Sequence, residues 1–176
     1  MGTATFIKAL RRVSGMTNLP SNQEQFMKVA IEKARKGIFL GQTPFGACIV
    51  KAGKVVSSFH NEVWQRLDST AHAEIIAIRE ACRRLKTIDL SGCVIYSTCE
   101  PCPMCFSACH WAKLSAIVYG AGIGDAQAAG FSELTLSDEE MKRRGKSPLS
   151  IRGGVLREDC ISLFTEWKQR PDSKAY

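Results

Sequence analysis

The sequence has no apolar run long enough to cross a bilayer, because polar or charged residues interrupt every hydrophobic stretch. It also lacks the pattern of a signal peptide, so we expect a cytoplasmic protein, without membrane contact, whose thiols are reduced. Eight cysteines are nevertheless present. A disulfide framework is therefore disfavoured, and the cysteines are expected to bind metal, to act in catalysis or to pack as buried thiols.

Acidic residues are absent before Glu24, and the first 20 residues match no motif. We expect residues 1–20 to be an N-terminal extension, either a docking helix or a disordered arm, and residues 21–176 to form one domain. The 24 basic and 17 acidic residues give a net charge of +7. The basic residues are scattered and no aromatic stripe runs between them, so a nucleic-acid partner is not favoured.

The periodic segments predict a layered α/β domain. Residues 21–38 show helical spacing behind a capping pair, Ser21 and Glu24. Residues 44–61 alternate as a hairpin that turns at Ala52 and Gly53. We expect further helices over residues 70–86, 103–112, 137–144 and 159–169, and strands over residues 93–97 and 116–120. Strands that alternate with helices favour a sheet that is parallel at least in part.

Four residues form a constellation with recognisable chemistry. Cys102 and Cys105 lie three residues apart at an expected helix start, so both sulfurs face one side near an end that favours thiolates. His72 supplies a third ligand, and three protein ligands plus a water or hydroxide describe a catalytic zinc site. Glu74 reaches the same ion only over the end of its helix, since residues two apart are rotated by ~200°. There Glu74 can accept the water's proton and act as general base and acid.

A closed structural zinc site is the main alternative from the residues alone. Cys99 or Cys109 would complete a Cys₃His set, and the protein would then be a zinc-stabilised interaction module without catalysis. That arrangement leaves the pairing of His72 with Glu74 unexplained. We therefore expect the remaining cysteines to be buried apolar side chains: Cys48, Cys82, Cys93, Cys99, Cys109 and Cys160.

The segments TAHAEIIAIREAC and CEPCPMC resemble the zinc-dependent cytidine deaminase superfamily, whose signature is His-x-Glu with Pro-Cys-x-x-Cys. PFGACIV, DAQAAGF and the C-terminal EWKQRPDSKAY resemble, more narrowly, its bacterial guanine deaminases. The resemblance covers about residues 22–176. It implies a three-layer α/β/α sandwich with a mixed sheet, one zinc ion per chain, and a homodimer that exchanges its C-terminal segments.

The resemblance also implies hydrolytic deamination of guanine to xanthine and ammonia, with Glu74 protonating the ring nitrogen beside the attacked carbon. Asp125 would assist proton transfer to the leaving amine, although it could equally be the N-cap of a short helix. Asn61 would bind the substrate by hydrogen bonds, and Phe45 and Trp111 would form aromatic walls against it. Tyr176, at the end of the tail, would close the pocket. Their plainer interpretations are a turn residue, core aromatics and a mobile chain end.

A few positions depart from that family's pattern. They are Ser69, Ser107, the single acid in GFSE and the basic residues 142–146. None touches the metal motif, so they bear on the substrate and not on deaminase chemistry. A tRNA adenosine deaminase shares the motif and would use the net charge of +7 on phosphates, so it stays open, as does a guanosine, cytosine or triazine deaminase.

Overall fold

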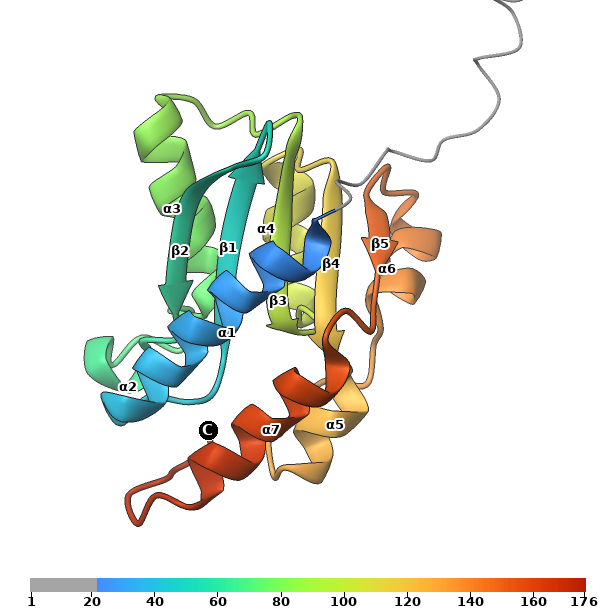
Figure 1. Cartoon of the computed structure of the whole chain (residues 1–176). Helices are drawn as coiled ribbons and strands as arrows, with labels where there is room; N and C mark the ends of the chain where they lie inside the picture. Colours follow the sequence, from blue (N-terminus) through green and yellow to red (C-terminus); the bar gives the residue numbers. More distant parts are fainter. Residues whose placement is uncertain (1–21) are drawn as a thin grey trace, which may run out of the picture.

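The computed structural model describes residues 22–176 (Figure 1). The extension predicted over residues 1–20 lies outside the described residues. The elements follow one another as α1 (Gln23–Phe39), β1 (Gly46–Lys51), β2 (Lys54–His60), α2 (Val63–Arg66), α3 (Ala73–Leu85), β3 (Cys93–Cys99), α4 (Pro103–Trp111), β4 (Ala116–Ala121), α5 (Ile123–Ala128), α6 (Asp138–Gly145), β5 (Ser150–Arg152) and α7 (Arg157–Lys168).

The strands form one mixed sheet in the order β2-β1-β3-β4-β5. β1 runs antiparallel to β2 and β3, whereas β3, β4 and β5 are parallel to one another. Cys99 at the end of β3 pairs with Ala121 at the end of β4. The segments that follow these two strands therefore begin side by side, at the edge where sites in parallel sheets are usually found.

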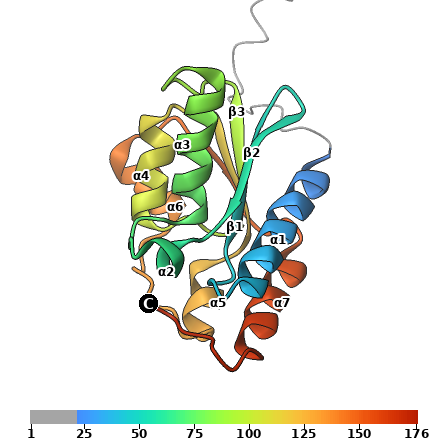
Figure 2. The ribbon, with the colours of Figure 1, turned by 90° about the vertical axis from the view of Figure 1, so that its left-hand side faces the viewer.

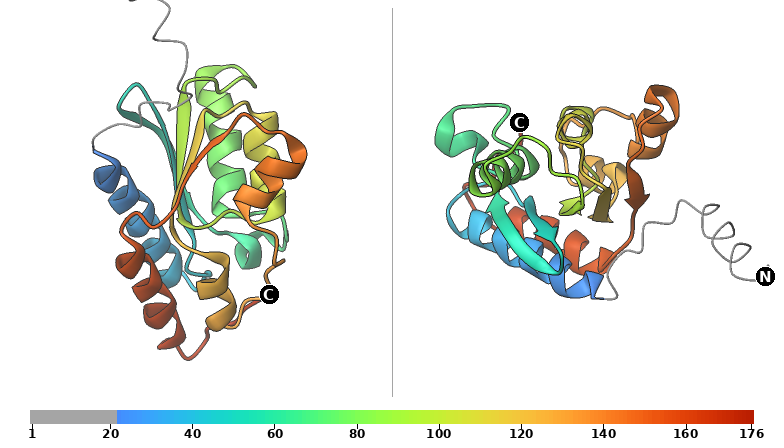
Figure 3. Two further views of the ribbon diagram at one scale, coloured as in Figure 1. Left: turned by 90° about the vertical axis from the view of Figure 1, so that its right-hand side faces the viewer. Right: turned by 90° about the horizontal axis from the view of Figure 1, so that it is seen from above.

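Helices cover both faces of the sheet (Figures 2 and 3). α1 and α7 pack on one face, and α3 and α4 on the other, with α6 against α4. Alternate residues of β1 divide between the faces: Cys48 lies in the core under α1, and Ile49 in the core under α3. At Gly46 a Cβ atom would lie 2.2 Å from the Ala30 carbonyl oxygen, so α1 packs against β1 only because this residue is glycine. The predicted three-layer sandwich is confirmed.

Most predicted elements agree with the observed bounds to within about two residues, and the helix starts show why some do not. The helix expected from residue 70 begins at Ala73, because His72 is its extended N-cap. α1 is preceded by Asn22 as N-cap, without a side-chain capping hydrogen bond, and Ser21 of the predicted capping pair lies outside the described residues. α2, α5 and β5 were not predicted in full, since elements of three to six residues carry too little periodicity.

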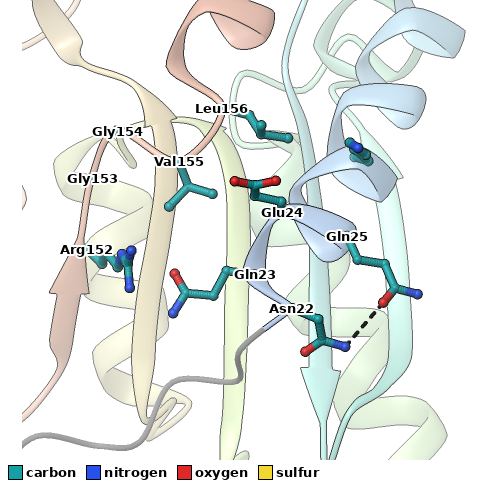
Figure 4. A pocket seen from close by; sticks show the side chains of 10 residues that line it. Asn22, Gln23, Glu24, Gln25, Arg152, Gly153, Gly154, Val155 and Leu156 are labelled. Carbon is teal, nitrogen blue, oxygen red and sulfur yellow. Dashed lines mark hydrogen bonds between the residues drawn. The ribbon is translucent and has the colours of Figure 1, made fainter.

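A cleft of about 770 Å³ opens between the start of α1 and the turn after β5 (Figure 4). Its lining includes Gln23, Lys28, Arg152 and Gly154, and none of the residues of the zinc motif. The size of a cleft therefore does not locate the chemistry of this molecule. Among the described residues, no helix is both long and apolar enough to pass through a lipid bilayer.

Candidate metal and catalytic site

Two helix starts place the candidate metal ligands. His72 is the N-cap of α3 and Cys102 is the N-cap of α4, and both have extended backbone. Pro103 occupies the first turn of α4, where its missing N–H costs nothing. Cys105 follows in the same turn. The three ligands therefore lie at the N-cap or in the first turn of their helices.

The ligand atoms have the spacing of a zinc site. His72 Nδ1 lies 3.7 Å from Cys102 Sγ and 3.6 Å from Cys105 Sγ, and all three ligand atoms lie within 4.8 Å of one another. A tetrahedral zinc ion with Zn–S of ~2.3 Å and Zn–N of ~2.0–2.1 Å separates its sulfur and nitrogen ligands by about 3.6 Å. The donor set and its spacing therefore fit zinc.

The electrostatics favour metal binding at Cys102. The hydrogen bond from Cys105 lowers the pKa of Cys102 to about 4, with a further contribution from His72 that opposes the effect of burial. The thiolate is the form of cysteine that coordinates a metal.

Cys99 and Cys109 do not complete a closed site. Cys99 is 5% exposed, its Sγ lies 3.7 Å from the Gly122 carbonyl oxygen, and burial raises its pKa well above the usual range. Cys109 is fully buried in the core between α3 and α4. Within residues 22–176 the cluster holds three protein ligands, which leaves a fourth position open.

Glu74 lies beside the open position. It is 6% exposed in the first turn of α3, and Ser97 Oγ donates a hydrogen bond to its Oε1 at 3.0 Å. Burial raises the pKa of Glu74 above its ordinary value. His72 and Glu74 converge because His72 precedes the helix, so the ~200° rotation between residues two apart inside a helix does not apply to the pair.

The cavity at this point measures about 10 Å³, which is close to the room that one water molecule needs. It is lined by Phe45, His72, Glu74, Cys99, Glu100, Cys102 and Glu133. Phe45 packs edge-to-face on Phe131, with ring centres 4.8 Å apart. The structure thus brings Phe45 to the metal ligands and holds its ring in a fixed orientation.

Tyr176, near the C-terminus, lies against the metal site. The hydroxyl oxygen of Tyr176 accepts a hydrogen bond from Asn61 Nδ2 at 2.7 Å and lies 3.2 Å from His72 Nε2. Asn61 is 1% exposed, and its Oδ1 accepts from the Val63 backbone N–H at 3.0 Å. Asn61 and Tyr176 are therefore both brought to the metal site.

Two predicted residues are placed elsewhere. Trp111 is 80% exposed at the far end of α4, where its ring contacts His110, and it does not line the cavity. Asp125 is also outside the cavity, because both its oxygens are engaged: Oδ2 accepts from the Gly122 N–H at 2.8 Å, and Oδ1 pairs with Arg157 at 2.5 Å. Within one chain neither Trp111 nor Asp125 lines the cavity, and the roles predicted for them stay predictions.

Glu133 is the site residue that sequence reasoning missed. It lines the cavity with Glu74, and its pKa is raised by burial and by the nearby charge of Cys102. Its only signal in the sequence was the single acid of GFSE, noted as a departure and not as a site residue. Four residues separate Glu133 from the end of α5, whose own acid, Asp125, was the more conspicuous candidate.

Comparisons with known proteins agree with this geometry. Residues 20–121 match the family model of the cytidine and deoxycytidylate deaminase zinc-binding region. The chain is 38% identical over 156 residues to guanine deaminase of Bacillus subtilis, covering 88% of this chain and 99% of that protein. It is 36% identical over 147 residues to the tRNA-specific adenosine deaminase of the same species, covering 82% and 88%. The solved guanine deaminase of Nitrosomonas europaea superposes with a TM-score of 0.79 at 27% identity, covering 96% of this chain and 95% of that one. The chain belongs to the cytidine and deoxycytidylate deaminase family, and it is a zinc-dependent nucleobase deaminase.

Proposed function

We propose that this enzyme deaminates free guanine to xanthine and ammonia. The observation that carries the proposal is the contact of the C-terminal tail with the metal site, where Tyr176 bonds to Asn61 and lies against His72. A pocket closed in this way suits a small base that is enclosed during the reaction. The Bacillus and Nitrosomonas relatives named as guanine deaminases support the same substrate.

Binding of the base requires the tail to move. The cavity of about 10 Å³ holds no purine while Tyr176 is docked, so we infer that the last residues open and then close again over the base. Once the hydroxyl of Tyr176 leaves, Asn61 Nδ2 is free to donate to a ring nitrogen or carbonyl of the substrate. Phe45 would then form an apolar wall against the flat ring.

The two carboxyl groups in the cavity divide the proton transfers. Zinc, when bound, supplies a water acidic enough to act near neutral pH. Glu74 accepts a proton from the attacking water and delivers it to the ring nitrogen beside the reacting carbon, while Ser97 holds one oxygen in place. Glu133 stands in the role that was expected of Asp125, because it lines the cavity and burial raises its pKa, which favours the protonated form that a proton donor needs. It would donate that proton to the departing amine.

A tRNA adenosine deaminase is the second candidate. It is supported by the Bacillus relative of that name and by the net charge of +7. An RNA strand would keep the C-terminal tail displaced for as long as it is bound, because the tail lies over the metal ligand, whereas the tail can close again over a free base. This requirement makes the free base the better substrate.

Ammonia release distinguishes the candidates when the zinc-loaded enzyme is given guanine, guanosine, cytosine, a triazine and anticodon-loop RNA in parallel. We expect guanine to be turned over and the RNA to be inert; turnover of the RNA alone would refute the proposal.

Glu74→Gln should reduce guanine turnover by roughly 10³-fold or more while one zinc stays bound per chain. Loss of zinc in that variant would instead make Glu74 a ligand.

We further propose that the enzyme is a homodimer in which Trp111 serves a neighbouring copy. Trp111, Leu114 and Pro148 line a cleft of about 570 Å³ on the outer side of α4, well suited to a second apolar surface. In this single chain the tail reaches its own His72; an exchanged tail would make the same contact in the partner. All eight cysteines are free thiols, which supports a reducing, cytoplasmic location. The proposed deamination of guanine would give the enzyme a role in purine catabolism. Cell fractionation tests that location.

A further inference from the structure

The second nitrogen of His72 has a partner that the deaminase chemistry does not use. Nδ1 faces the two cysteine sulfurs, and Nε2 on the opposite side of the ring lies 3.2 Å from the hydroxyl oxygen of Tyr176. If Nδ1 binds the metal, the neutral imidazole carries its hydrogen on Nε2. That N–H needs an acceptor, and Tyr176 presents one.

The hydroxyl of Tyr176 can satisfy two donors at once. A phenolic oxygen accepts two hydrogen bonds and donates one. Here it accepts one from Asn61 Nδ2 at 2.7 Å and is placed to accept the second from His72 Nε2. Asn61 is itself held by the Val63 backbone N–H at its other end. The oxygen is therefore fixed from the side of α2, and its position orients the imidazole.

The last residue of this chain is anchored, whereas a terminal residue usually frays. Trp64 Nε1 donates to the Lys174 carbonyl oxygen at 2.9 Å, and the Lys174 ammonium lies 4.5 Å from the centre of the Trp64 ring. The ring of Tyr176 packs edge-on against Trp64 and Phe131, with centres 6.3 Å apart in both pairs. These contacts place the tail independently of the hydrogen bond to His72.

We propose that Tyr176 is a positioning residue for the metal ligand His72: its hydroxyl fixes the tautomer and the ring orientation, so that zinc retention depends on the docked C-terminus. Partners of this kind typically change metal affinity by roughly 10–100-fold when they are removed. Opening the tail to admit a base releases the hydrogen bond to His72, and closing it restores the full ligand geometry. The inference rests on the metal site of the proposed function, and not on the identity of the base.

The test is the zinc affinity of the full-length chain, measured without substrate by competition with a chromophoric chelator. Tyr176→Phe removes only the hydroxyl and keeps the ring against Trp64 and Phe131. We expect its zinc dissociation constant to rise by roughly 10–100-fold. Tyr119→Phe is the matched control, because Tyr119 lies in β4 and makes no side-chain hydrogen bond to a metal ligand among the described residues; its zinc affinity should equal that of the wild type.

A second readout separates ligand orientation from tail packing. With Co²⁺ in place of zinc, the visible absorption bands of Tyr176→Phe should shift, and those of Tyr119→Phe should not. Trp64→Phe weakens the anchor of the tail and should give a smaller loss of zinc affinity than Tyr176→Phe. Wild-type zinc affinity and unshifted cobalt bands in Tyr176→Phe would overturn the inference even if the enzyme deaminates guanine. A wild-type chain that binds no zinc would overturn the proposed function as well.

Discussion

α4 and α5 follow neighbouring parallel strands and begin at the same edge of the sheet, yet only α4 begins over the metal site. The first turn of α4 carries Cys102 and Cys105, whose sulfurs both face His72. The first turn of α5 carries Asp125, whose carboxylate is spent on its own helix start and on Arg157. Equivalent positions in the topology therefore hold candidate metal ligands in one case and a carboxylate engaged in structural contacts in the other.

The difference lies in which partners each side chain finds nearby. The Cys105 backbone N–H bonds to the Cys102 sulfur and helps to lower its pKa, and both sulfurs face His72 Nδ1, so they are available to an ion. Asp125 meets the Gly122 N–H and the Arg157 guanidinium before it can reach the cavity. α5 contributes instead through the segment after it, which returns Glu133 to the cavity. The ends of the parallel strands predict where the site lies. The hydrogen-bond and ion-pair partners of each side chain decide which residues reach it.

The largest expected effect comes from two cysteines of α4 that are equally buried. Cys105→Ala and Cys109→Ala each remove one fully buried sulfur, four residues apart on the same helix. Cys105→Ala should lose stoichiometric zinc and all turnover, because two protein ligands remain. Cys109→Ala should keep both, and lose only about 1 kcal/mol of unfolding free energy for a small cavity. Zinc content by atomic emission and thermal unfolding check the pair; zinc loss from Cys109→Ala would revive the closed four-ligand site.

The next effect contrasts the two acids associated with α5. Glu133→Gln removes the second proton carrier in the cavity and should lower kcat for guanine by roughly 100-fold with zinc retained. Asp125→Asn weakens a pair whose arginine is 47% exposed, so it should cost at most about 1 kcal/mol of stability and leave kcat unchanged. Steady-state kinetics decide between them. A large loss in Asp125→Asn, with Glu133→Gln active, would return the assignment to Asp125.

The metal site could be predicted from the sequence because its determinants are local. The spacing of Cys102 and Cys105 within one turn, and Pro103 between them, already sets two ligands and a helix start. Trp111 shows where local spacing fails: six residues beyond Cys105, it is rotated by about 240° and lies about 9 Å further along the axis. Glu133 could not be placed at all, since its position depends on how the irregular segment between α5 and α6 packs. Tertiary contacts, not periodicity, bring it to the cavity.

The smallest expected effect tests the far end of α4 and completes the contrast with its first turn. Trp111 is 80% exposed and Phe39, on the opposite face of the sheet at the end of α1, is 78% exposed. Because both side chains are exposed to solvent in the single chain, neither contributes much to its stability. If the outer side of α4 is the dimer interface, Trp111→Ala should weaken dimerisation by roughly 30-fold, the size typical of a buried tryptophan anchor, whereas Phe39→Ala should change nothing. Sedimentation equilibrium measures both, and zinc content should stay at one per chain in each variant because Trp111 touches no ligand.

A monomeric wild type, or a dimer that only Phe39→Ala disrupts, would move the interface to another face. In that case Trp111 would have no access to a neighbouring site, and its exposed ring would need a different partner.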